Sequence, residues 1–287
     1  MRSDEFQRCA KRWLSTYRRD VLGVEDDGIW VQNGKAYPHI LPQAKHQLNI
    51  LPSFRDQFWR WFPGQHIQLQ RDFHHLNSSQ ALCFNLFFPM LNGRQALGAL
   101  LPALNIEGIA GNRGDFEYQP ELSEGTCIDF SLPLQSGGRV NFEIKYTESE
   151  FGSAKADEAH IDKFDRVYRH RLAGRFSGPF CRPEKFLEHY QIARNIWHLN
   201  ETAGDIAVFL FPKANTCLRR QEPVIKVCAL EPFRSRIRIM YLEDLVLDLF
   251  NQLSTSDTGR FLAQFRLKYL SFLTPGASDT SVKDRTL

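Results

Sequence analysis

The sequence predicts an α/β fold, with one core and a helical N-terminal extension, and three observations support this. Two runs of alternating apolar and polar residues flank a turn at Gly137-Gly138, which is the pattern of a β-hairpin. Apolar residues at helical spacing precede the hairpin at 78–104 and follow it at 156–199. A continuous apolar run at 205–212 predicts a buried strand, and this mixture of elements is typical of an α/β domain.

The N-terminal extension contains three predicted elements. Apolar residues recur at helical spacing from Phe6 to Tyr17, with arginines and a lysine on the other faces. Asn33-Gly34 predicts a β-hairpin with a two-residue type I′ turn. Residues 53–62 predict a short aromatic helix.

The elements of the core follow in order. Ser78 or Ser79 is expected to cap a helix that is apolar on nearly every side, and Pro89 is expected to limit it. Residues 115–121 alternate as a strand before the central hairpin. Pro183 is expected in the first turn of a single helix, 183–199. Further helices are predicted at 93–104, 156–172, 242–250 and 259–273, and a further strand at 236–242.

Composition limits the class of protein. Apolar and charged fractions of 43% and 24% in 287 residues are those of a globular protein, and a net charge of +3 neither requires nor excludes nucleic acid. Six cysteines without a CxxC pair indicate reduced thiols and argue against a structural zinc site. With no signal peptide and no apolar run of membrane-spanning length, we expect a cytoplasmic protein with no membrane partner.

The polar face of the predicted hairpin carries the candidate chemistry. Pairing of its strands can place Asp129 beside Glu143 and Lys145, and the preceding strand adds Glu117 to the same surface. Clustered carboxylates repel each other, and a divalent cation such as Mg²⁺ relieves this repulsion. A lysine beside the metal can orient or deprotonate water, or stabilise negative charge. The alternative is an exposed sheet face with ordinary solvated charges.

Asp129 followed by Glu143-Ile144-Lys145 resembles the motif of the PD-(D/E)XK nuclease superfamily. The neighbourhood "FEIKYTESEFG" is similar to a bacterial restriction-endonuclease-like group within it, as is the order helix, three strands, helix, strand over about residues 75–212. The resemblance implies a mixed central sheet flanked by helices. It also implies Asp129, Glu143 and the Ile144 carbonyl as metal ligands, and Lys145 as the catalytic lysine.

Two departures from the motif concern its flanks. Ile128 stands where the motif has proline, and the helix that often brings a further glutamate offers only Gln80 and Asn85. We therefore take Glu117 as the substitute acid. The alternative is that Glu117 is a surface glutamate.

The helix predicted from Pro183 adds a second group of polar residues. Gln191, Arg194 and Asn195 lie on one side of it. By resemblance to the superfamily, Gln191 completes the catalytic site, and Arg194 is expected to contact a DNA phosphate. The alternative is a polar helix face in contact with water.

The sequence thus predicts a metal-dependent nuclease that hydrolyses DNA phosphodiester bonds, with Mg²⁺ as cofactor and Mn²⁺ as a substitute. The alternative is a non-catalytic nucleic-acid-binding or scaffold protein that keeps the nuclease fold. Three segments are predicted: an extension packed on the core (1–75), the nuclease-like domain (76–274) and a disordered polar tail (275–287). A homodimer is left open.

Overall fold

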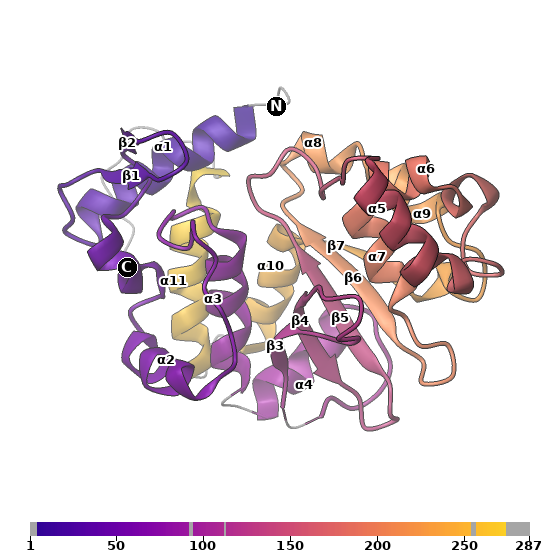
Figure 1. Ribbon diagram of the computed structural model, residues 1–287. Helices are drawn as coiled ribbons and strands as arrows, with labels where there is room; N and C mark the ends of the chain where they lie inside the picture. The colour runs from indigo at the N-terminus through magenta and orange to yellow at the C-terminus, as the bar shows by residue number, and fades with distance from the viewer. Residues whose placement is uncertain (1–4, 92–93, 112, 254–256, 274–287) are drawn as a thin grey trace. The chain divides into compact units, whose positions relative to one another are not determined.

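The computed structural model describes residues 5–91, 94–111, 113–253 and 257–273. The chain divides into two compact units (Figure 1). Unit 1 consists of the chain up to Ala103 together with the chain from Leu242 onward, and unit 2 consists of Leu104–Tyr241. The segment boundaries predicted at residues 75 and 274 stay a prediction, and the predicted tail lies outside the described residues.

Unit 2 is built on a five-stranded mixed sheet in which the strands follow their order in the chain. β3, β4 and β5 are antiparallel, whereas β5, β6 and β7 run parallel. The strands are β3 (Asp115–Tyr118), β4 (Ile128–Pro133), β5 (Arg139–Ile144), β6 (Ile206–Phe211) and β7 (Ile237–Tyr241). The predicted α/β class with a mixed sheet is therefore confirmed.

Helices cover one face of this sheet, where apolar side chains form a continuous core (Figure 1). They are α5 (Glu158–Lys163), α6 (Pro183–Glu188), α7 (Tyr190–Trp197), α8 (Thr216–Arg219) and α9 (Glu222–Val227). Two helix predictions need correction. The helix from 156 continues beyond α5 as a π-helical segment, Phe164–Tyr168. The single helix predicted from Pro183 is broken at His189, whose φ of −120° and ψ of 42° are not helical.

The predicted turn between β4 and β5 requires its two glycines. Gly137 has a φ of 101°, which is in the region that residues other than glycine rarely adopt. A Cβ atom on Gly138 would lie 2.4 Å from the carbonyl oxygen of Ala203. The two glycines therefore allow the tight connection that sets the register of the hairpin.

Unit 1 consists of helices and a two-stranded hairpin. Its elements are α1 (Glu5–Asp20), β1 (Gly28–Trp30), β2 (Lys35–Tyr37), α2 (Arg55–Trp61), α3 (Ser79–Leu91), α4 (Arg94–Ala103), α10 (Leu242–Leu253) and α11 (Asp257–Tyr269). α10 packs on α4, and α11 packs on α1 and α3. Each of the two chain segments thus completes the core of the other.

Two local predictions in unit 1 are wrong. Trp30 pairs with Lys35, so the hairpin connection has four residues rather than the two of a type I′ turn. Pro89 lies inside α3 and does not end it, although Ser78 does accept a hydrogen bond from the Ala81 N–H at the start of this helix.

A buried polar network lies inside unit 1. The ammonium of Lys268 donates to the main-chain oxygen of Asn49 at 2.5 Å and to its side-chain oxygen at 2.6 Å. Asn85 donates to the same main-chain oxygen and to the hydroxyl of Tyr269. Burial, and secondarily the charge of Arg55, lower the pKa of Lys268 well below its ordinary value. Across the described residues, no helix is both long and apolar enough to cross a bilayer.

Candidate active site

The register of the central hairpin brings Asp129 and Glu143 together. Phe130 pairs with Phe142 in the antiparallel register. The next residue of each strand away from the turn, Asp129 on β4 and Glu143 on β5, therefore faces the other. The main-chain N–H of Ile144 donates to Asp129 Oδ2 at 2.6 Å. The Asp129 side chain thereby binds the strand that carries the other two residues of the motif.

Lys145 completes this group directly after β5. Its Nζ lies 2.7 Å from Glu143 Oε1, and its main-chain N–H donates to Leu210 on β6. The surrounding face is not solvated, because the side chain of Glu143 is only 3% exposed and Asn141 is buried beside it. The alternative of an exposed sheet face with ordinary solvated charges is therefore wrong.

Burial and mutual charge control the ionisation of this group. Burial first, and then the charge of Glu143, raise the pKa of Asp129 well above its ordinary value, against the opposing effects of Lys145 and the Ile144 N–H. Burial alone would lower the pKa of Lys145. The charges of Glu143, Asp129 and Glu148 outweigh burial, so the pKa of Lys145 is raised.

Glu117 lies next to this group in the sheet. The β3–β4 register places it opposite Asp129, and its charge contributes to the raised pKa of Asp129. Its φ of 47° is in the left-handed region, which costs a residue other than glycine about 1–3 kcal/mol. Strained residues of this kind cluster at functional sites. The structure thus brings Glu117 to the predicted place, while its role as a ligand stays a prediction.

Helix α7 covers the carboxylate of Glu143. Asn195 Nδ2 donates to Glu143 Oε2 at 2.7 Å, and Arg194 Nη2 lies 3.5 Å from the same oxygen. Arg194 is buried and also donates to the carbonyl of Cys127. The alternative of a polar helix face meeting water is therefore wrong for these two residues. The contact of Arg194 with DNA phosphate stays a prediction.

Gln191 lies one turn before Asn195 on α7. Its main-chain oxygen accepts the second hydrogen bond of Asn195 Nδ2, and its side chain packs where a Cβ atom on Gly152 would stand. The side-chain oxygen of Gln191 is buried without a hydrogen-bond partner among the described residues. No direct bond joins Gln191 to Asp129, Glu143 or Lys145 in that part of the chain, and its catalytic role stays a prediction.

A second buried carboxylate, which the sequence did not reveal, holds both ends of α7. Glu124 accepts hydrogen bonds from Tyr168 and from His198 at the end of α7, and Tyr190 at its start lies 3.4 Å away. Lys163 Nζ lies 3.2 Å from the carboxylate. Burial opposes ionisation, but hydrogen bonds led by His198 lower the pKa of Glu124. The local sequence of Glu124 is that of a loop, so only the fold could identify it.

The donor atoms of the site fit Mg²⁺. Asp129 and Glu143 supply two adjacent carboxylates, and Mg²⁺ is usually bound by one or two carboxylates with water and substrate phosphate in its other positions. No group of three or more His, Cys, Asp or Glu side chains gathers at metal-binding spacing within residues 5–91, 94–111, 113–253 and 257–273. Oxygen ligands on neighbouring strands suit a hard cation rather than zinc.

Comparison with known proteins places the chain in a family. No curated protein and no solved structure was found to match the chain. A model of the family described as "Restriction Endonuclease associating with ARP" matches residues 10–270, which include all of unit 2, most of unit 1 and every candidate site residue. This agrees with the fold and with the resemblance seen in the sequence. The chain therefore belongs to this family of restriction endonucleases.

Proposed function

We propose that this protein is a metal-dependent endodeoxyribonuclease that hydrolyses phosphodiester bonds of DNA. The observation that supports it most directly is the juxtaposition of Asp129, Glu143 and Lys145 on adjacent strands of the sheet. Membership of a restriction-endonuclease family supports the reaction class. The description of that family also names an association with ARP, and we extend such a partner to this chain as part of the proposal.

Asp129, Glu143 and the Ile144 carbonyl would hold Mg²⁺, with Glu117 as a further ligand directly or through water. Bound Mg²⁺ would supply Lewis-acid polarisation of the phosphate and a lower pKa for a bound water. Asn195 and Arg194 fix the carboxylate of Glu143 from the helix side. The Ile144 N–H orients Asp129 from the strand side.

Lys145 would act on the charge of the phosphate. Its neighbours raise its pKa, so its ammonium keeps its proton at neutral pH. A protonated lysine next to the scissile phosphate can stabilise the negative charge of the transition state. It cannot accept a proton from water, so the role of charge stabilisation suits Lys145 better than that of a general base.

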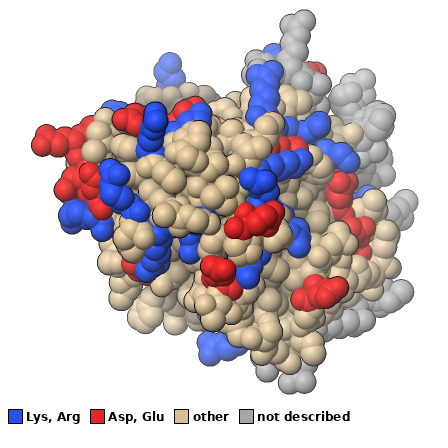
Figure 2. Space-filling view, turned by 90° about the vertical axis from the view of Figure 1, so that its right-hand side faces the viewer, with Lys and Arg blue, Asp and Glu red and all other residues tan. Residues whose placement is uncertain are grey.

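The charge distribution suits local rather than general attraction of DNA. On the face that Figure 2 shows, Lys and Arg side chains are interspersed with Asp and Glu and separated by uncharged surface. This agrees with a net charge of only +3. DNA contacts would therefore depend on particular cations, among which we propose Arg194.

The decisive experiment is nicking of a supercoiled plasmid by the purified protein. Nicking with Mg²⁺ or Mn²⁺ that is abolished by EDTA, and that is absent from a Glu143→Gln variant purified in parallel, supports the enzyme. DNA binding without nicking under either metal would instead support the alternative, a nucleic-acid-binding protein that keeps the fold without turnover.

A further inference from the structure

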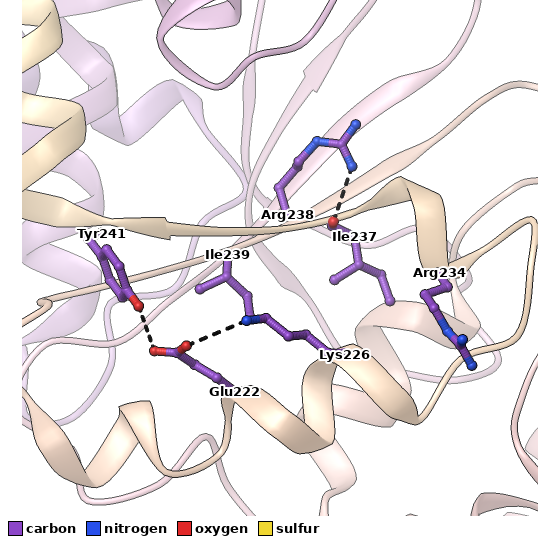
Figure 3. Close-up of a pocket in the computed structure, with 7 residues that line it drawn as sticks. All are labelled: Glu222, Lys226, Arg234, Ile237, Arg238, Ile239 and Tyr241. Carbon is purple, nitrogen blue, oxygen red and sulfur yellow. Dashed lines mark hydrogen bonds and ion pairs between the residues drawn. The ribbon is translucent and has the colours of Figure 1, made fainter.

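A cavity of about 380 Å³ lies in unit 2, apart from the candidate active site, between β7 and α9 (Figure 3). From β7 it is lined by Ile237, Ile239 and Tyr241, which alternate along the strand and point toward α9. The strand order of the sheet ends at β7 in the described part of the chain. The cavity thus adjoins the last strand of the sheet.

The cavity reaches the edge of β7 as well as the face that β7 turns toward α9. Arg238 also lines it, although its side chain leaves the opposite face of the strand from Ile237 and Ile239 (Figure 3). A space that is lined by residues of both faces of the last strand borders the outer edge of that strand. Arg238 Nη1 donates to the carbonyls of Ser235 and Ile237, which holds the guanidinium beside this edge.

The rim of the cavity is cationic. Lys226, Arg234 and Arg238 oppose a single carboxylate, that of Glu222. This carboxylate is already engaged, because the Tyr241 hydroxyl donates to it at 2.8 Å and Lys226 lies 3.9 Å away (Figure 3). Charge complementarity therefore favours an acidic ligand.

Apolar surface around the rim favours a protein over DNA. Ile237 and Ile239 are only partly buried, although they pack against the core. Val227, next to Lys226, is 54% exposed, and Leu230, whose carbonyl accepts a hydrogen bond from Arg234, is 36% exposed. A DNA backbone gains nothing from contact with apolar surface of this kind, whereas the apolar side chains of a peptide can bury it.

We propose that the outer edge of β7 binds an extended acidic segment of a partner protein, which adds to the sheet as a further strand. Main-chain hydrogen bonds to the strand edge would supply affinity, and side chains at alternate positions would supply specificity. Side chains of directly opposed residues share a face. The segment therefore places apolar residues opposite Ile237 and Ile239 and an acidic residue opposite Arg238.

The test uses the full chain and a fluorescein-labelled peptide of alternating valine and glutamate, without divalent metal. We expect saturable binding by fluorescence anisotropy, and slower hydrogen exchange of the amides of residues 237–240 when the peptide is bound. A peptide of alternating valine and lysine should bind at least tenfold more weakly. No binding of the first peptide, equal binding of both, or unchanged exchange in β7 would overturn the proposal.

Matched charge reversals test the position of the site. Arg238→Glu should weaken binding of the valine–glutamate peptide at least tenfold. Arg166→Glu, at an exposed arginine paired with Asp162 elsewhere in unit 2, should leave binding unchanged. Unchanged melting temperatures establish that both variants fold, and Arg234→Glu serves as the second rim variant if Arg238→Glu does not fold. Equal effects of the rim and control variants would overturn the position.

Two other occupants are outcomes of the same test. Competition of a 20-base-pair DNA duplex with the peptide, lost in the rim variants, would assign the edge to nucleic acid and overturn the proposal. Concentration-dependent dimerisation that Arg238→Glu abolishes would assign the edge to a second copy of the chain, with the same consequence. Because peptide binding requires neither metal nor turnover, the Lys145→Ala variant should bind the peptide normally whether or not the protein cleaves DNA.

Discussion

Lys145 in unit 2 and Lys268 in unit 1 are both largely withdrawn from solvent, yet their surroundings shift their pKa values in opposite directions. The ammonium of Lys145 lies 2.7 Å from Glu143, and neighbouring carboxylates raise its pKa. The ammonium of Lys268 donates to two uncharged oxygens of Asn49, and burial lowers its pKa. The comparison shows that burial alone does not decide the direction in which the pKa of a buried lysine shifts, because the charges that face the ammonium can outweigh it.

The largest effect we expect is on cleavage. Lys145→Ala should reduce the rate of plasmid nicking by roughly 10²–10³-fold, because it removes a positioned charge at the phosphate. DNA affinity and melting temperature should remain nearly unchanged. Lys268→Met is the matched variant of a buried lysine, and it should nick at the wild-type rate. Equal losses in the two variants, measured in the same assay, would remove the functional distinction between the lysines.

A smaller effect is expected from Glu117. Glu117→Gln keeps the left-handed backbone and the size of the side chain but removes its charge from the vicinity of Asp129. Half-maximal cleavage should then need several-fold more Mg²⁺, and Mn²⁺ should restore part of the activity because it binds such ligands more tightly. A metal titration that matches wild type would identify Glu117 as a residue outside the site.

The third prediction concerns melting without metal. The raised pKa of Asp129 means that folding penalises its ionised form. This penalty is absent below about pH 4, where the unfolded chain is also protonated, and it is complete above the folded pKa. Asp129→Asn should therefore melt higher than wild type at pH 8, by about 2–4 °C per kcal/mol of relief, and not at pH 4.

Mg²⁺ provides the control for this measurement. The ion should raise the melting temperature of wild type, because it binds the folded state, and should not raise that of Asp129→Asn. Equal shifts in both proteins would place the ion elsewhere.

The smallest effect is the reverse pH trend at Lys268. The lowered pKa of Lys268 means that folding penalises its charged form. This penalty is complete at pH values below the folded pKa, and it is absent above about pH 10.4, where the unfolded chain has also lost the proton. Lys268→Met removes this penalty and also loses two hydrogen bonds, a loss that does not depend on pH. The melting temperature of the variant relative to wild type should therefore fall as pH rises from 7 to 10. A flat difference would contradict the lowered pKa.

Sequence patterns predicted the parts of the site that depend on neighbouring residues. Alternation around Gly137 was enough to place Asp129 opposite Glu143, because the turn fixes the register of a hairpin. Alternation carries no information on what covers a face, so the burial of Glu143 was not predicted.

The remaining parts depend on contacts between distant residues. The amide of Asn195 reaches Glu143 across 52 positions, and Glu124 meets His198 across 74. The break at His189 between α6 and α7 likewise follows from packing, since the local pattern favours one continuous helix. No periodicity in the sequence encodes these contacts.

The discontinuity of unit 1 has a consequence for synthesis of the protein. α1, α3 and α4 leave the ribosome first, but their packing partners α10 and α11 follow only after the roughly 140 residues of unit 2. At 5–20 residues per second, this interval lasts about 7–28 s. During that time the nascent chain carries α3, which is apolar on nearly all sides, without its final neighbour α11. The order of the chain therefore delays the packing of the early helices, while the strands and helices that carry Asp129, Glu143 and Lys145 are complete before translation ends.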